Sequence, residues 1–288
     1  MRKTTKYLLA TATSLLALYA LATASSDSKV AVSDKIIEEQ RANLAKNTKG
    51  AGFGPQAPRD IDNLEGKNSR AFGSAPAFTT MNLCNIHFHK NAEHKGGEFT
   101  KYAGNGDGKG SETGFKYNGT LTAAELAPTE GEIGKGKHGT VEPGDTIEVH
   151  YVYTTAQVEP GPTLGSCLSE SIKNPQLRVE TQVYVLVNDT SALNFIDLTK
   201  HEVRNGVHQA INIPSNTGTS VQYEGSTTGP SYNEVGSPFQ VSWSVRPKVS
   251  KVNINSVGEW FKNNVFKEDH AHGVRNLVRN PALLSKIN

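Results

Sequence analysis

The amino-acid sequence predicts a mostly β fold of the α+β class, with a few short helices. Segments rich in β-branched and aromatic residues recur along the chain, as strands require. Clusters of glycine, proline, asparagine and serine separate these segments and are typical of turns. The strongest strand candidates are MNLCNIHFH, DTIEVHYVYTT, LRVETQVYVLVND and PFQVSWSVRPKVS, at residues 81–89, 145–155, 177–189 and 238–250.

Two segments have the pattern of a short helix. The segment SDKIIEEQRANLAKN is amphipathic and begins with Ser33 and Asp34, residue types that cap helix N-termini. The segment SVGEWFKNNVF, residues 256–266, predicts a second helix near the end of the chain.

Residues 103–140 are rich in glycine and lack a sustained apolar period, so we expect a long insertion between strands. Within it, GNGDGKG suggests a calcium-binding loop. However, its acidic residues do not alternate at EF-hand positions and the closing glutamate is missing. A solvated loop is therefore the better interpretation.

Residues 1–24 have the pattern of a secretory signal peptide. A basic start, MRKTTK, precedes an apolar run from Tyr7, and Ala-Thr-Ala at residues 22–24 fits a cleavage site. The run is short and broken by threonine and serine, whereas a membrane-spanning helix needs about 20 apolar residues. We therefore expect an exported protein, periplasmic or secreted, that has no membrane contact after the signal is cleaved.

The rest of the chain divides into a polar N-terminal segment, residues 25–52, and a single domain, residues 53–288. The formal net charge is only +2, and no Lys/Arg cluster interleaves with aromatic residues. This composition argues against nucleic acid as a partner. The sequence does not fix the oligomeric state, and an oligomer stays open.

Cys84 and Cys167 are the two cysteines of the chain. Because an exported protein meets oxidising conditions, we expect them to form a disulfide. The alternatives are two separate buried thiols, or a zinc-thiolate role for Cys84 that would leave Cys167 unpaired.

A candidate metal site begins at His87 and His89. On a strand, side chains at i and i+2 leave the same face, so both imidazoles project together while Phe88 points away. A catalytic zinc needs three protein ligands and an open fourth position. The strand candidate DTIEVHYVY offers His150 as the third ligand, with Glu148 on the same face.

Metal-bound histidines usually donate their second N–H to an oxygen acceptor that fixes the ring. Asn85 and Glu148 stand two residues before His87 and His150 and could supply such acceptors. These histidines could instead merely line a polar strand face. The combination of His-x-His, a trailing Glu-His pair and a separate Glu-x-His favours metal binding.

Part of the pattern is typical of cupins, which carry His-x-His, then a glutamate, then a distant histidine after a Pro-x-Gly turn. Glu93 follows His89 at a suitable distance. The Pro-Gly pair at residues 143–144, however, lies too far ahead of His150 and has the wrong form for that motif.

More of the chain resembles carbonic anhydrases. GFGPQAPRDID is similar to the Gly-x-x-Gln-Ser-Pro-Ile-Asp-Ile opening of the alpha class, with matches at Gln56, Pro58 and Asp60. Three later segments match in the same chain order, and together they span most of the mature sequence. They are NIHFHKNAEH, IEVHYVY and YEGSTTGPSYNEVGSPFQVSWSV.

Two departures from the alpha class point to a subclass. The gap between Glu93 and Glu148 is far longer than in alpha enzymes, and the stretch from Asp60 to His87 is shorter. Together with the local sequence NLCNIHFHKNAEH, these departures make the chain resemble the delta class of alpha-like carbonic anhydrases.

This resemblance implies a central, largely antiparallel β-sheet and an enzyme that hydrates CO2 reversibly to bicarbonate and a proton, and the signal pattern implies that this enzyme is exported. It implies that His87, His89 and His150 hold Zn2+ and that zinc-bound hydroxide attacks CO2. Co2+ or Cd2+ could replace zinc, since histidine sites tolerate metals of similar preference. The alternatives are a non-catalytic carbonic-anhydrase-related binding module and a cupin-type metalloenzyme.

The resemblance also implies that Glu93 orients a gatekeeper threonine. A gapless alignment favours Thr228, and a one-residue slip would select Thr227. An ordinary Ser/Thr turn is the alternative interpretation of both residues.

The apolar CO2 pocket of the family matches Val152, Val179 and Trp243. Taken alone, each of these residues is also what an ordinary core would contain.

The usual proton-shuttle histidine of the family has no counterpart, because no histidine lies between Asp60 and His87. A second His-x-His, at residues 270 and 272, lacks a strand context and a third ligand, which argues against a second metal site. The remaining shuttle candidates are His94, His138, His201, His208, His270 and His272.

Overall fold

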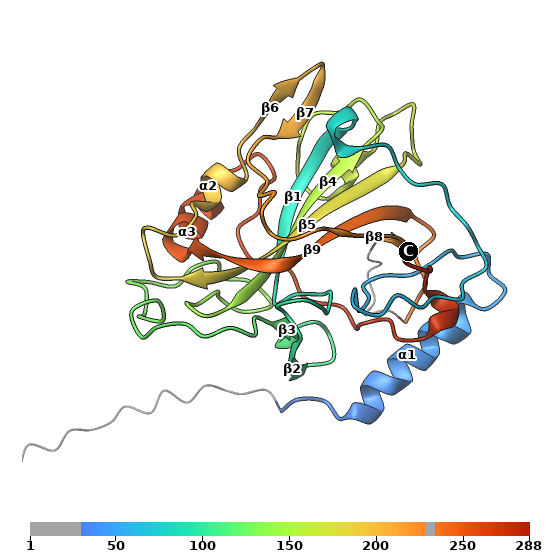
Figure 1. Cartoon of the computed structure of the whole chain (residues 1–288), viewed down its shortest axis with the longest axis horizontal. Coiled ribbons are helices and arrows are strands. Elements are labelled where there is room, and N and C mark those ends of the chain that lie inside the picture. The colour runs from blue at the N-terminus through green and yellow to red at the C-terminus, as the bar shows by residue number, and fades with distance from the viewer. Residues whose placement is uncertain (1–29, 228–233) are drawn as a thin grey trace, which may run out of the picture.

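The computed structural model describes residues 30–227 and 234–288, and its centre is a five-stranded sheet (Figure 1). The strand order is β1-β4-β5-β9-β8, and every neighbouring pair is antiparallel except β5 and β9. The strands are β1 (Asn82–Lys90), β4 (Thr146–Thr154), β5 (Leu177–Val187), β8 (Val221–Ser226) and β9 (Gln240–Asn253). The mostly β fold predicted from the sequence is confirmed.

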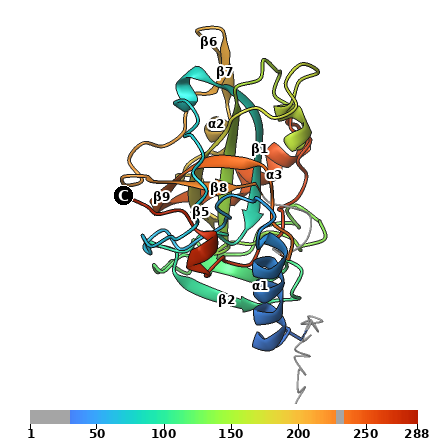
Figure 2. The same cartoon turned by 90° about the vertical axis from the view of Figure 1, so that its right-hand side faces the viewer.

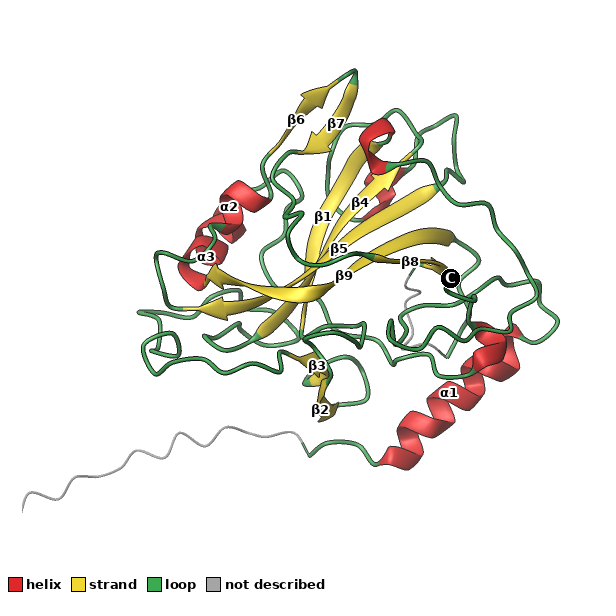
Figure 3. Cartoon of the chain, in the orientation of Figure 1, coloured by secondary structure: helices red, strands yellow, loops and turns green. Residues whose placement is uncertain are grey.

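Helices are few, and among the described residues only α1 is longer than nine residues (Figure 3). They are α1 (Asp34–Thr48), α2 (Phe195–Leu198) and α3 (Ile254–Lys262), with 3-10 turns η1 (Phe78–Thr80), η2 (Leu164–Cys167) and η3 (Pro281–Leu283). The two helices expected from the sequence are therefore present, although α3 begins and ends a few residues earlier than its pattern indicated. No helix among the described residues is both long and apolar enough to cross a membrane. The expected signal peptide lies outside the described residues.

Two small hairpins lie beside the main sheet. They are β2 (Lys101–Asn105) with β3 (Thr113–Lys116), and β6 (His201–Arg204) with β7 (Val207–Ala210). The first hairpin falls partly inside the glycine-rich segment, where the sequence predicted only a loop. Asp107 forms its turn by accepting backbone N–H bonds from Lys109 at 2.7 Å and Ser111 at 3.0 Å. The carboxylate of GNGDGKG thus stabilises the turn through these hydrogen bonds.

The central strands are buried on both faces, so each face supports its own apolar cluster. All nine residues of β4 are buried, and its side chains alternate between the two clusters. Val149 and Tyr151 join the cluster that packs on α2 and α3. Val152 joins the other cluster, on the face that also carries Glu148 and His150. This second face is where the candidate site lies.

The face of the candidate site depends on an irregularity in β1. Leu83 pairs with Tyr153 while Asn85 pairs with Val152, so Cys84 is an extra residue, as in a β-bulge. Leu83 consequently packs in the cluster of the α2 and α3 face, and Cys84 packs in the opposite cluster. Beyond the bulge, alternate residues of β1 point to the candidate site.

The structure joins Cys84 to Cys167, the pairing expected from the sequence. The bond ties β1 to η2 across 83 residues of sequence. Both sulfur-bearing residues are fully buried.

The helix α1 packs against the end of the chain (Figure 2). Leu44 is buried in a small apolar cluster with Val278, Leu283 and Leu284. The described part of the N-terminal polar segment is therefore attached to the domain through the C-terminal segment.

Candidate metal centre

The strands β1 and β4 bring three histidines together on one face of the sheet. His87 pairs directly with His150 across the two strands, and His89 pairs with Glu148. The ring centroids of His87 and His89 lie 5.1 and 4.8 Å from that of His150. One ring nitrogen from each of the three histidines can be chosen so that all lie within 4.8 Å of one another.

Hydrogen bonds to the second nitrogen of each ring fix which nitrogen remains free. His87 Nδ1 lies 2.6 Å from the Asn85 side-chain oxygen, and His89 Nδ1 lies 2.8 Å from the Gly273 carbonyl oxygen. His150 Nε2 lies 2.7 Å from Glu148 Oε1. Because these oxygens accept, each of these nitrogens carries the proton. The nitrogens with lone pairs are then Nε2 of His87, Nε2 of His89 and Nδ1 of His150.

This arrangement fits a metal ion. Nε2 of His89 is buried and has no hydrogen-bond partner among the described residues, which is costly unless another group occupies the position. Three imidazoles with an open fourth position are the donor set of catalytic zinc sites. The acceptors behind them, Asn85 and Glu148, are those that the sequence predicted, whereas the Gly273 carbonyl was not foreseen.

The electrostatics keep the three imidazoles neutral. Burial lowers the pKa of His87 well below 6.5, and the nearby His150 lowers it further. Burial likewise lowers the pKa of His89 to about 3. Burial also lowers the pKa of His150, although the hydrogen bond to Glu148 opposes that change. Neutral rings have the lone pairs that a metal requires.

Glu148 is the centre of a buried network behind the site. Its Oε1 accepts from His150 and from His94 Nδ1, both at 2.7 Å, and its Oε2 accepts from the His94 backbone N–H at 3.0 Å. Burial would raise the pKa of Glu148, but His94 and His150 hold it well below 4.5. Tyr223 donates its hydroxyl to His94 Nε2 at 2.7 Å. His94 is thus a core residue, which removes it from the shuttle candidates.

Glu93 lies next to the triad, fully buried. Its Oε1 accepts from the Arg275 backbone N–H at 3.1 Å, and its Oε2 has no hydrogen-bond partner among the described residues. Burial raises the pKa of Glu93. The hydroxyl of Thr227 lies 2.9 Å from the Ser237 hydroxyl, and no described contact joins it to Glu93. Thr228, the other candidate gatekeeper, lies outside the described residues.

The residues predicted to wall the substrate pocket share the face of the triad. Val152, Val179 and Trp243 are buried in one apolar cluster. The Trp243 ring centroid lies 5.1 Å from that of His150. The structure therefore places an apolar wall directly beside the candidate metal centre.

Of the other predicted shuttle candidates, the structure brings His272 to the site. Its ring centroid lies 5.2 Å from that of His87, and its side chain is 42% exposed. Its Nε2 lies 2.7 Å from Glu268 Oε2. His138 packs beside Gly273, and His270 lies 5.8 Å from His272, ring to ring. Among the described residues, the second His-x-His joins no group of potential metal ligands.

His201 and His208 lie on the β6–β7 hairpin and take no part in this arrangement. His208 Nε2 is 3.0 Å from the exposed carboxylate of Glu159. The sequence missed the contact of His272 because it depends on a parallel bridge between His272 and His89, which no local pattern indicates.

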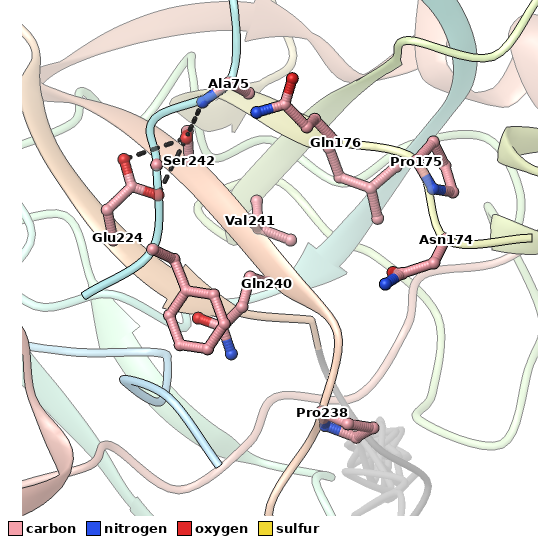
Figure 4. A pocket seen from close by; sticks show the side chains of 12 residues that line it. Ala75, Asn174, Pro175, Gln176, Glu224, Pro238, Gln240, Val241 and Ser242 are labelled. Atoms are coloured by element: carbon pink, nitrogen blue, oxygen red, sulfur yellow. Dashed lines mark hydrogen bonds between the residues drawn. The ribbon is translucent and has the colours of Figure 1, made fainter. Parts of the chain in front are cut away.

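A separate pocket of about 220 Å³ lies at the ends of β5, β8 and β9 (Figure 4). Ser242 lines it and accepts from the Ala75 backbone N–H at 2.7 Å, while the Ser242 hydroxyl donates to Glu224 at 2.9 Å. Because side chains alternate along β9, Ser242 points away from the face that carries Trp243. This pocket is distinct from the metal centre.

The fold and the site together define a β-sheet protein with a group of three histidines that could hold a metal ion. Comparison with known proteins specifies the family: the family model described as Delta carbonic anhydrase matches residues 78–256. The chain belongs to this family. The match covers both histidine-bearing strands, and it decides against the cupin interpretation.

Solved structures of carbonic anhydrases also match, at low identity. A halotolerant carbonic anhydrase from Dunaliella salina is 11% identical, with 85% of this chain and 93% of that chain covered and a TM-score of 0.35. The alpha-carbonic anhydrase of Photobacterium profundum is 14% identical, with 83% and 92% covered and a TM-score of 0.26. That of Thermovibrio ammonificans is 16% identical, with 81% and 87% covered and a TM-score of 0.28. No curated protein sequence matches the chain.

Proposed function

We propose that this protein is an exported, zinc-dependent carbonic anhydrase that interconverts CO2 and bicarbonate. The observation that carries the proposal is the convergence of three neutral imidazole nitrogens, each fixed by an acceptor on the other side of its ring. Zinc bound there would acidify a water and so supply a nucleophile at neutral pH, the chemistry for which carbonic anhydrases are the standard example. His87, His89 and His150 would be its ligands.

The remaining residues of the face would bind and orient the reactants. Val152, Val179 and Trp243 provide an apolar surface beside the ligands, which suits CO2 because CO2 is apolar. Glu93 has one buried oxygen that can accept a hydrogen bond from a hydroxyl group. We assign that hydroxyl to Thr228 on the gapless motif alignment, and the threonine would in turn orient the attacking water.

The rest of the proposal concerns the organisation of the chain. The catalytic domain would be residues 53–288, preceded by a signal peptide at residues 1–24. Export is supported by the signal pattern and by the disulfide, since disulfides persist in oxidising compartments. The substrate would be a small molecule, and nothing in the charge distribution favours nucleic acid.

The test is CO2 hydration by purified protein in a stopped-flow instrument, combined with metal analysis. We expect one zinc per chain and catalysis above the buffer rate. The variant His150→Ala should lose both, while His201→Ala, on the distant hairpin, should keep both. A folded protein that holds zinc but does not accelerate hydration would overturn the proposal.

A further inference from the structure

The loop between β4 and the second cysteine covers one edge of the histidine-bearing strand. We call residues 155–167 the strap. The strand β1 is at the edge of the central sheet, so its outer backbone groups have no strand partner within that sheet. The strap supplies one such partner, because the Gly161 N–H donates to the Cys84 carbonyl at 3.0 Å. It also binds a side chain of β1, since Asn82 donates its amide to the Ala156 carbonyl at 3.0 Å.

The strap also holds the residue that orients a metal ligand. Asn85 donates its amide N–H to the Gly161 carbonyl at 3.0 Å, which leaves its oxygen directed at His87 Nδ1, 2.6 Å away. A contact chain thus runs from the strap through Asn85 to His87. Gly161 holds both the bulged residue Cys84, by its N–H, and Asn85, by its carbonyl.

The disulfide fixes this arrangement at the bulge itself. Cys84 is the extra residue of β1, and its bond to Cys167 fastens the far end of the strap to it. Thr154, the last residue of β4, donates its hydroxyl to the Cys167 carbonyl at 2.8 Å, so the strap is closed at both ends. A bulge directs the side chains that follow it, and here those side chains are Asn85 and His87.

We propose that formation of the Cys84–Cys167 disulfide preorganises Asn85 and His87, so that the protein acquires its full zinc affinity only after oxidation. The proposal rests on the zinc site of the proposed function. In the oxidation, the two thiols lose two protons and two electrons to a disulfide donor, which leaves as a dithiol. Because both cysteines are fully buried, small reductants do not reach the disulfide in the folded protein. The bond therefore forms during maturation and is not a reversible switch.

The first experiment compares zinc affinities by competition with a chromophoric chelator, in buffer where circular dichroism shows each variant to be folded. Asn85→Ala should weaken zinc binding by about 10 to 100-fold, as loss of an acceptor behind a ligand does. The double variant Cys84→Ala/Cys167→Ala should weaken it by about tenfold. Leu44→Ala, in the apolar cluster of α1, which contains no residue of the strap or of the triad, should lower the melting temperature without changing zinc affinity.

A mutant cycle then tests whether both changes act on the same ligand. If the disulfide acts through Asn85, adding Asn85→Ala to the cysteine double variant should leave affinity within about twofold of Asn85→Ala alone. Fully additive losses, or a cysteine double variant that binds zinc as tightly as the wild type, would overturn the inference.

A second variant perturbs the strap while the disulfide stays intact, in case the cysteine variant does not fold. Gly161→Pro removes the N–H that donates to the Cys84 carbonyl, so the bulge loses this contact with the strap and zinc binding should weaken several-fold. Ser166→Ala, which keeps both contacts of Gly161, should bind zinc as the wild type does. Unchanged affinity in Gly161→Pro refutes the inference, whereas a wild-type protein that binds no zinc at all refutes the proposed function itself.

Discussion

The buried carboxylate of Glu148 offers the sharpest test of the network behind the metal centre, through the isosteric change Glu148→Gln. The carboxylate accepts three hydrogen bonds: from His150 Nε2, from His94 Nδ1 and from the His94 backbone N–H. A glutamine has one accepting oxygen and one NH2 group. If its oxygen stays with the two rings, its NH2 faces the His94 backbone N–H, so two donors meet without an acceptor.

The size of the effect follows from that count. The bond from the His94 backbone N–H is lost, which leaves that N–H and the new NH2 group buried and unpaired. The bonds from the two rings remain but become weaker, because their acceptor is no longer charged. An unpaired buried polar group costs about 1–3 kcal/mol, and a hydrogen bond to a charged group is worth about 1.5–3 kcal/mol, more than a neutral one. We therefore expect Glu148→Gln to lower the free energy of unfolding of the metal-free protein by about 3–5 kcal/mol.

Urea unfolding of the metal-free protein, followed by circular dichroism, measures this loss. Zinc affinity, measured separately, should fall by about 10 to 100-fold because the His150 ring loses its fixed acceptor. Gln182→Glu is the control. It places a carboxylate at a buried position of β5 on the opposite face of the sheet, away from the three donors of Glu148, and it should not stabilise the protein. A Glu148→Gln protein with wild-type stability and wild-type zinc affinity would refute the network.

Three further predictions concern the residues around this network. Tyr223→Phe leaves His94 Nε2 without its donor, and the free energy of unfolding in urea should fall by about 1–3 kcal/mol. Val179→Phe fills the apolar wall, so CO2 hydration should fall at least about tenfold while the chelator assay shows unchanged zinc affinity, and equal activity would contradict the pocket assignment. Burial raises the pKa of Glu180 above its ordinary 4.5, so the folded state binds this proton more tightly than the unfolded state. Stability should therefore fall as pH rises from 4.5 through the raised pKa, and Glu180→Gln should unfold at a higher temperature than the wild type at pH 7.5 but not below pH 4.5.

Much of the site follows from the two-residue period of a strand. That period placed His87 with His89 and His150 with Glu148, because both strands are long and regular where these residues lie. The pairing of His87 with His150 then needs only one register between β1 and β4. The main strands were predictable for the same reason.

Other parts of the site depend on contacts that no local pattern records. The Gly273 carbonyl that holds His89, and the position of His272, come from a parallel bridge between the C-terminal segment and β1. From the sequence, His94 was one of the shuttle candidates. Its role in the core depends on Tyr223, which lies 129 residues away.

The bulge at Cys84 could not be predicted from the sequence either, because a bulge is defined by the pairing with a partner strand. An uninterrupted alternation would place Leu83 on the same face as Asn85 and His87. The structure instead packs Leu83 on the opposite face, beside α2 and α3. Similarly, the β2–β3 hairpin was not predicted, because its two strands flank a glycine-rich turn and are too short to show the alternation of a strand.

The most direct test of the central claim is the rate of CO2 hydration by one purified sample carried through removal and return of zinc. We predict catalysis in the zinc-loaded protein, loss of catalysis after a chelator removes the metal, and recovery when one equivalent of zinc is restored. A protein that is folded and fully loaded with zinc at His87, His89 and His150, yet hydrates CO2 no faster than buffer, would contradict the account.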